Sequence, residues 1–247
     1  MGHKRTVTIH TNYRYKHQRD WAASLAEGCR RHGCAALITQ DQTASGDVHI
    51  VLGPHYAMQP WIGQPDIILL DRCYYGDTNQ VARLGWLRPD GAQTFATGYS
   101  RPVPGIKNWR NGGNRALVLA DFGQDASNIV AEARGYYSEV RLRLHPSNHK
   151  PHESLGDSVS WADAVIGTAG TALIQGILEG VPTTCLDPRH IARPVSSHVI
   201  GEVWMPDRTD WLRDLAYAQW SHDEMKSGEA WEALNDNHTL KRHAAYL

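Results

Sequence analysis

The chain has 247 residues, of which 41% are hydrophobic and 21% charged, and its formal net charge is −1 at pH 7. This length suffices for one large or two small domains, and the composition is typical of a globular protein. No run of about 18 apolar residues occurs, and no apolar segment follows the start. These features argue against a membrane-spanning helix and a signal peptide, so we expect a protein of the cytoplasm.

Charge and cysteine content narrow the class of partner. Residues 1–115 carry 14 Lys and Arg against 8 Asp and Glu, whereas residues 116–247 carry 11 against 18. A basic first half favours an anionic partner, although an acidic tail alone could produce the same asymmetry. The four cysteines show no metal-binding spacing, and the 14 histidines are dispersed. We therefore predict free thiols, no metal site and no bound cofactor.

Apolar runs of strand length alternate with helical patterns through the first 71 residues. A β-branched run at 6–10 precedes a helical pattern that ends at Gly33, and further apolar runs follow at 35–39, 47–53 and 66–71. Continuous apolar runs of this kind indicate parallel strands that are covered on both faces. The next segment, 72–115, is rich in Gly, Pro, Arg and aromatic residues, which fits either a loop-rich functional surface or a crossing between domains.

The same alternation restarts at residue 115. We predict strands at 115–120, 140–146, 164–168 and 183–187, with helices at 126–137 and 170–179, and helical structure from Arg208 onward that includes a capping box at Ser221 and Glu224. The pattern predicts an α/β protein with two Rossmann-like, doubly wound parallel sheets that face a cleft. The expected domains are 1–112 and 113–207, followed by C-terminal helices at 208–247 that pack back across them.

The turn Gly167–Thr171 is the clearest candidate for chemistry. It joins a buried strand to a helix, so its unpaired backbone N–H groups and the helix dipole can bind an anion. Small residues allow a phosphate to approach, although tight strand–helix packing would also explain them. His145-Pro146 ends the preceding strand, and parallel strands bring their carboxyl ends to one edge. We expect His145 and the turn to bind one phosphate group.

These residues resemble a known family. The sequence "RLHP", followed by "WADAVIGTAGTALIQGILEGVPTTCLDP", is similar to the nucleotide-sugar-binding half of GT-B-type glycosyltransferases, especially those of bacterial capsular polysaccharide, Kdo and sialic acid synthesis. Sugar-nucleotide epimerases are more distantly similar. The segment "VLADFGQDAS" resembles the first strand and loop of the same half. The family usually has Glu where this chain has Gln175, so the preferred nucleotide is open, with a UDP-linked sugar expected.

The resemblance implies a donor site in the second half that needs no metal, and the chain contains no D-x-D sequence. The expected donor-binding residues are Asp125, Ser127, His145, Gly167, Thr168, Ala169, Gly170, Thr171, Gln175, Arg193, Ser196 and Ser197.

The same architecture assigns the acceptor and a general base to the first half. Asp71, at the end of an apolar strand, is the first candidate for the base, with Asp77 and His55 as alternatives. Asp71 could instead cap a turn or pair with an arginine. Basic and aromatic residues of 72–115 could contact phosphates and stack on bases, or could simply be packed. The expected acceptor-binding residues are Arg72, Tyr74, Tyr75, Arg83, Trp86, Arg88, Trp109 and Arg110.

Two further segments, "DRCYYGDTNQVARLGW" and "DLAYAQWSHDEMKSGEAW", resemble small glycosyltransferase-like proteins of bacteriophages. This resemblance implies a hydroxymethylated pyrimidine in phage DNA as the acceptor, which would have to be flipped out of a duplex. The alternatives are an epimerase-like enzyme acting on a nucleotide sugar, a capsule-type glycosyltransferase, and a non-catalytic nucleotide- or DNA-binding module.

Overall fold

The chain forms two compact units in the computed structural model, which describes residues 4–11, 15–52, 59–97, 101–147 and 152–245. Unit 1 comprises Met1–Pro102 and Arg213–Leu247, and unit 2 comprises Val103–Leu212. The division falls within helix α6 (Thr209–Tyr217). Within the described ranges, no helix combines the length and the apolar character needed to cross a bilayer.

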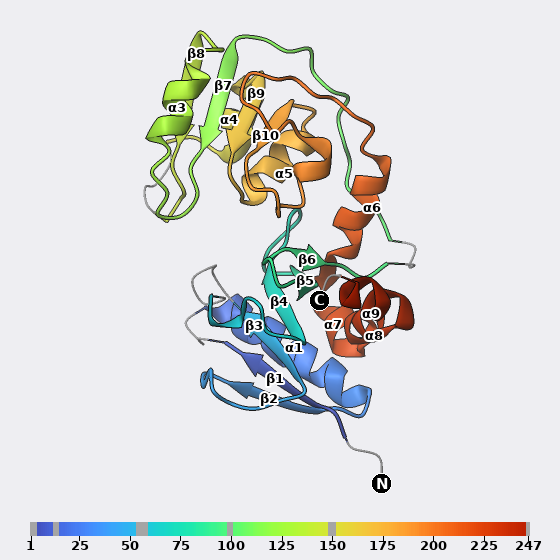
Figure 1. The fold of residues 1–247 in the computed structure, drawn as a ribbon. Helices are drawn as coiled ribbons and strands as arrows, with labels where there is room; N and C mark the ends of the chain where they lie inside the picture. The colour runs from blue at the N-terminus through green and yellow to red at the C-terminus, as the bar shows by residue number, and fades with distance from the viewer. Residues whose placement is uncertain (1–3, 12–14, 53–58, 98–100, 148–151, 246–247) are drawn as a thin grey trace. The chain divides into compact units, whose positions relative to one another are not determined.

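Unit 1 contains a mixed sheet. Over the described residues it has seven strands in the order β11-β5-β4-β3-β1-β2, with β6 paired to β5. Figure 1 labels β1 to β6 of this sheet. The strands are β1 (Thr6–His10), β2 (Ala35–Thr39), β3 (Val48–Leu52), β4 (Ile67–Arg72), β5 (Val81–Leu87), β6 (Gln93–Thr94) and β11 (Gln219–Ser221). The first four pair in parallel, whereas β5 pairs antiparallel with β4, β6 and β11.

The core of unit 1 joins the beginning of the chain to its C-terminal segment. Trp21 and Leu25 of α1 are buried together with Trp220, Met225 and Trp231. The helices are α1 (Lys16–Arg31), α7 (His222–Ser227), α8 (Glu229–Asn235) and α9 (Asn237–Ala244). The non-polar surface that they bury against the strands is the main favourable contribution to the stability of this unit.

Unit 1 departs from the expected doubly wound sheet in two ways. The segment 72–115 contains β5 and β6, which the sequence pattern did not reveal. The described α-helices that pack on the sheet share the core of Trp21 and Trp86 on one face. The opposite face, among the described residues, carries the short helix η1 (Gln59–Trp61), with Trp61 packed on Val51 and Ile67. The C-terminal capping box is confirmed at Ser221, but the helix predicted there is divided into α7 and α8 by a left-handed Gly228.

Over its described residues, unit 2 contains a four-stranded parallel sheet in the order β10-β9-β7-β8. Its strands are β7 (Arg115–Leu119), β8 (Glu139–Arg143), β9 (Ala164–Gly167) and β10 (Thr183–Cys185), and its helices are α3 (Ser127–Ala133), α4 (Leu155–Trp161) and α5 (Thr171–Leu178). A short helix, η2 (Arg193–Val195), follows β10. The elements appear in the upper part of Figure 1.

Helices cover both faces of the unit 2 sheet. Ala116 and Val118 of β7 pack with Ala133 of α3, whereas the α5 residue Leu173 lies beside Gly167 on the other face. Both β7–β8 and β9–β10 are joined through a helix, and the chain crosses over β7 between β8 and β9. The predicted Rossmann-like arrangement is therefore confirmed for unit 2.

Candidate functional site

The candidate site is the carboxyl edge of the unit 2 sheet. β8 lies on one side of β7, and β9 and β10 lie on the other, so the direction of winding reverses between β7 and β9. In open α/β sheets, ligands bind at the carboxyl ends of the strands beside such a reversal. The loop that begins after β7 and the turn after β9 are therefore the two segments expected to contact a ligand.

The turn after β9 has the geometry of an anion site. Gly170 is the N-cap of α5, with φ 99° and ψ 153°, and no side chain of α5 caps this end of the helix. This backbone conformation is open almost only to glycine. The absence of a Cβ at Gly170 also leaves space for Asp121, since a Cβ built there would lie 2.8 Å from Asp121 Oδ1.

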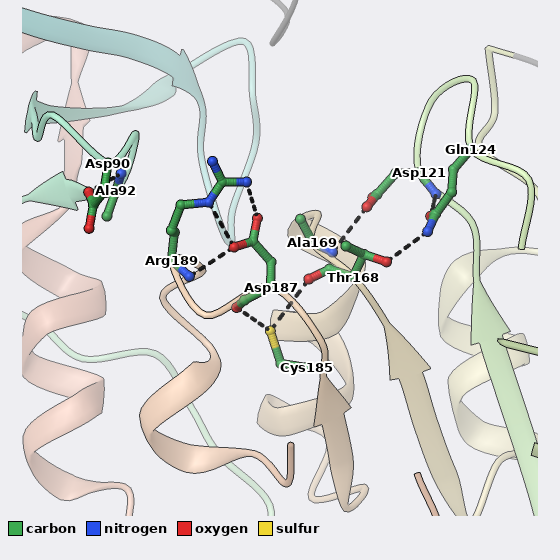
Figure 2. A network of polar contacts seen from close by, with 9 residues as sticks. All are labelled: Asp90, Ala92, Asp121, Gln124, Thr168, Ala169, Cys185, Asp187 and Arg189. Carbon is green, nitrogen blue, oxygen red and sulfur yellow. Dashed lines mark hydrogen bonds and ion pairs between the residues drawn. The ribbon is translucent and has the colours of Figure 1, made fainter. Parts of the chain in front are cut away.

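Asp121 is one of the residues of this site that the sequence analysis missed, together with Gln124, Asp187 and Arg189. It follows β7, and its Oδ2 accepts a hydrogen bond of 3.0 Å from the backbone N–H of Ala169 in the turn. Gln124 strengthens the connection, because its Oε1 accepts from Asp121 N at 3.0 Å and its Nε2 donates to Thr168 Oγ1 at 2.7 Å. Figure 2 shows both side chains reaching across from the β7 loop to the turn. A carboxylate of the chain itself thus occupies the anion position.

Burial changes the acidity of this carboxyl group. It raises the pKa of Asp121 to about 6, and the charge of Asp187 acts in the same direction, while the N–H of Ala169 opposes both. Hydrogen-bond donation by Ala169 stabilises the charged form, but desolvation has the larger effect. A carboxyl group with this pKa exchanges its proton close to neutral pH, which is characteristic of functional sites.

Asp187 and Arg189 form an ion pair on the other side of the turn (Figure 2). Arg189 donates two side-chain hydrogen bonds to the Asp187 carboxylate, one of 2.9 Å from Nε to Oδ1 and one of 2.8 Å from Nη2 to Oδ2. Burial would raise the pKa of Asp187, but the hydrogen bonds from Arg189 bring it below its ordinary value. The pair is therefore charged at neutral pH and fixes a guanidinium group at the end of β10.

Cys185 lies between the turn and this pair. Its Sγ donates to the carbonyl oxygens of Thr168 and Asp187, each at 3.5 Å. Burial raises the pKa of the Cys185 thiol to about 11. It is therefore a neutral thiol at physiological pH and is unsuited to act as a nucleophile.

His145 lies at the same edge as the turn, after β8. Its Nδ1 accepts a hydrogen bond of 3.2 Å from Ser147 N, and its ring packs edge-to-face on Phe122 at 5.8 Å between centroids. β7 lies between β8 and β9 in the sheet. The loop that follows β7 carries Asp121 and Phe122. Shared binding of one phosphate by His145 and the turn stays a prediction.

The other predicted donor residues differ in accessibility. Gln175 is half-buried on α5, one turn beyond Thr171. Asp125 is exposed, and its Oδ1 accepts from Ser127 N at the start of α3. Arg193 donates to the carbonyl oxygen of Cys185 at 2.8 Å.

Ser196 and Ser197 are buried, with exposed fractions of 0% and 3%. Their hydroxyl groups donate to the carbonyl oxygens of Ala192 and Val199. These serines stabilise their own segment, and a ligand contact would require those bonds to break.

The residues predicted to act as the base lie in unit 1. Asp71 Oδ2 accepts a hydrogen bond of 2.8 Å from Arg83, and its Oδ1 accepts from Arg72 N. The pairing with an arginine, which the sequence left open as an alternative, is therefore present. Asp77 Oδ1 accepts from Asn79 N and closes a turn. His55 lies outside the described residues.

Several predicted acceptor residues have structural roles. Trp86 is fully buried, and its Nε1 donates to Leu234 O, so its assignment to acceptor binding is wrong. The pattern showed its size and neighbours but not that it faces the core. Tyr74 is also buried, with Arg83 stacked on its ring at 4.7 Å. Arg88 is paired with Asp90.

Two more of these residues belong to unit 2. Trp109 Nε1 donates to Pro206 O, and the Arg208 guanidinium stacks on the Trp109 ring at 3.7 Å. Arg110 donates to three carbonyl oxygens at the end of α4. Both side chains hold chain segments together. Arg72 is exposed and Tyr75 half-buried, so both keep surface for a ligand.

Among the residues that the structure describes, no three His, Cys, Asp or Glu side chains are grouped so that they could hold a metal ion. The charged groups described at this edge of unit 2 include Asp121, Asp125, Arg193 and the Asp187–Arg189 pair.

Comparison with known proteins supports the fold. No family model and no curated protein matches the chain. Among solved structures, the chain is similar to KpsC of Thermosulfurimonas dismutans, a beta Kdo 2,7 transferase, with a TM-score of 0.51 and 12% sequence identity. The similarity covers 92% of this chain and 98% of that chain. At this level of identity the similarity concerns the fold alone.

Proposed function

We propose that the chain is a metal-independent glycosyltransferase of the GT-B type, which moves a sugar from a nucleotide donor to a hydroxyl group. The observation that carries this proposal is the glycine-containing turn at the start of α5, located where the unit 2 sheet reverses its winding. The similarity of fold to a Kdo transferase over 92% of the chain supports it. Unit 2 is the proposed donor-binding part and unit 1 the proposed acceptor-binding part.

The donor phosphates would accept hydrogen bonds from the backbone N–H groups at the beginning of α5. Thr168 adds a hydroxyl whose oxygen is already bonded by Gln124, so its hydrogen is available to a ligand. Arg189, which is paired with Asp187, adds guanidinium N–H donors at the neighbouring strand end. Such preorganised donors would stabilise the charge that develops on the departing nucleotide. A UDP-linked sugar is the proposed donor.

A saccharide hydroxyl is the acceptor that the fold comparison favours, since KpsC is a transferase of the sugar Kdo. The prediction of a DNA acceptor depended on accessible basic and aromatic residues in 72–115. Of these, Arg83 and Arg88 are bonded to carboxylates and Trp86 is buried. A hydroxymethylpyrimidine in DNA is kept as the second candidate because the first half of the chain carries an excess of positive charge.

A transfer assay tests the proposal. The protein is incubated with UDP-, GDP-, ADP- and CMP-linked sugars and with either capsular oligosaccharides or hydroxymethylated and unmodified DNA, in the presence of EDTA. We expect nucleotide release together with a mass increase of one acceptor by one sugar. Sugar conversion without an acceptor would favour the epimerase-like alternative. Nucleotide binding without turnover of any donor would contradict the proposal and favour a binding module.

The Glu139→Gln variant is the matched control for charge. Glu139 is exposed at the amino end of β8, at the edge opposite to the site. Its activity should equal that of the unchanged protein, whereas Gly170→Ala should lose donor binding.

A further inference from the structure

We propose that Asp121 couples anion binding at the donor site to a proton, because its carboxyl group must be neutral for a phosphate to bind at the turn. The inference rests on the proposed function, because it concerns the same turn. It assigns to Asp121 a role that neither the sequence pattern nor the fold comparison supplies.

Geometry is the first part of the argument. Asp121 Oδ2 lies 3.0 Å from Ala169 N, and Oδ1 lies 2.8 Å from the position of a Cβ at Gly170. Both carboxyl oxygens therefore lie over the turn. A phosphate that approaches the N–H groups of the turn meets at least one of them. Two anionic oxygens cannot share hydrogen-bond contact without a proton between them.

A proton on Asp121 removes this conflict. Oδ2 can keep the N–H of Ala169 while a protonated Oδ1 donates to a phosphate oxygen, which is a short and strong kind of hydrogen bond. Gln124 prevents the simple alternative of moving the loop, because it joins Asp121 N to Thr168 Oγ1. Binding of the anion would then be coupled to the uptake of one proton.

The surrounding charges do not offset a charged Asp121. Asp187 is balanced by Arg189, and Asp125 on the same loop adds a further negative charge. Arg193, which donates to the carbonyl oxygen of Cys185, supplies one positive charge against the two negative charges of Asp121 and Asp125. With Asp121 charged, the described groups at the turn therefore carry net negative charge, apart from the helix dipole. The raised pKa of Asp121, about 6, is consistent with this surrounding.

Binding as a function of pH tests the inference. The probes are sulfate and UDP-glucose, whose charges stay constant between about pH 5 and pH 8. Their affinities are measured by calorimetry and by the amide NMR signals of Ala169 and Gly170. We expect the affinity to fall about tenfold per pH unit above pH 6, and calorimetry in buffers of different ionisation enthalpy to show uptake of one proton.

Asp121→Asn mimics the neutral acid, since the amide oxygen can accept from Ala169 N and the amide nitrogen can donate to a phosphate. At pH 8 it should bind about a hundredfold more tightly than the unchanged protein, with no dependence on pH. Glu139→Gln should keep the original dependence. Asp121→Ala removes both the charge and the hydrogen bonds, so it should bind independently of pH but more weakly than Asp121→Asn, and the difference between the two variants is the contribution of hydrogen bonding.

Each result distinguishes this inference from the proposed function. If nucleotide sugars bind and react but Asp121→Asn changes neither affinity nor pH dependence, the inference is wrong and the proposed function stands. If sulfate shows the proton-coupled binding but no nucleotide sugar binds or reacts, the role of Asp121 in anion binding stands and the proposed function is wrong. Absence of binding by every probe, to the unchanged protein and to Asp121→Asn alike, would overturn both.

Discussion

Replacement of Gly170 by alanine tests the geometry of the turn most directly. The backbone at Gly170 has φ 99° and ψ 153°, a conformation that costs an alanine about 1–3 kcal/mol. The new Cβ would also lie 2.8 Å from Asp121 Oδ1, so the carboxyl group must shift away from Ala169 N. With loss of part of that hydrogen bond, we expect unit 2 to be destabilised by about 2–4 kcal/mol in total.

Gly123→Ala is the matched control. Gly123 also has a positive φ, 72°, but a Cβ there would contact nothing within 4 Å. Its substitution should therefore cost only the backbone term, about 1 kcal/mol. Urea unfolding of both variants, monitored by fluorescence, gives the two free energies of unfolding. Equal losses of stability in the two variants, with sulfate binding unchanged in Gly170→Ala, would refute the view that Asp121 is held over the turn.

Three further predictions concern unit 1. Asp71→Asn should lower its free energy of unfolding by about 2–3 kcal/mol, because Arg83 would lose the partner of a largely buried ion pair; an unchanged urea midpoint would contradict this. Gln219→Met should lower the free energy of unfolding by a similar amount, about 2–3 kcal/mol, because the buried side-chain amide oxygen of Gln219 accepts a hydrogen bond from the backbone N–H of Tyr74. Hydrogen exchange at the Tyr74 N–H should accelerate. Burial lowers the pKa of His243 below its unfolded value of about 6.5, so the stability it contributes is present above pH 6.5 and is lost as the pH falls below it. His243→Phe should therefore show a smaller loss of stability than the unchanged protein between about pH 7 and pH 5 in urea unfolding, and an equal loss would exclude His243 as the cause.

The sequence predicted those elements whose apolar runs are continuous. The strands at 6–10, 35–39 and 115–120 and the helix before Gly33 are present, because an unbroken apolar run or an apolar helical face is a signal that lies within the segment itself. β5 was missed since "VARLGWL" alternates core residues with Arg83 and Gly85 inside a segment rich in loop-forming residues. α4 is short and partly polar, which hides it among the loops.

The candidate site could be predicted only where its residues are close in sequence. The turn after β9 was recognisable from Gly167 to Thr171, because glycines and threonines at a strand–helix junction form a local pattern. Asp121 contacts Ala169 across 48 positions, and nothing in its own segment indicates this. Trp86 illustrates the opposite error, since an aromatic residue among arginines resembles a stacking surface until the sheet register shows which side of the strand it occupies.

Unit 1 is built from two stretches that are far apart in the sequence, and this has a consequence for folding during synthesis on the ribosome. The apolar residues of β1 and α1, including Trp21 and Leu25, find their partners Met225 and Trp231 only after some two hundred further residues have been translated. Unit 2 is contiguous in sequence, so it can fold while the apolar surface of the first strands is still exposed to solvent. A released chain that ends after residue 212 should accordingly carry a protease-resistant second unit behind a leading portion that proteases cleave.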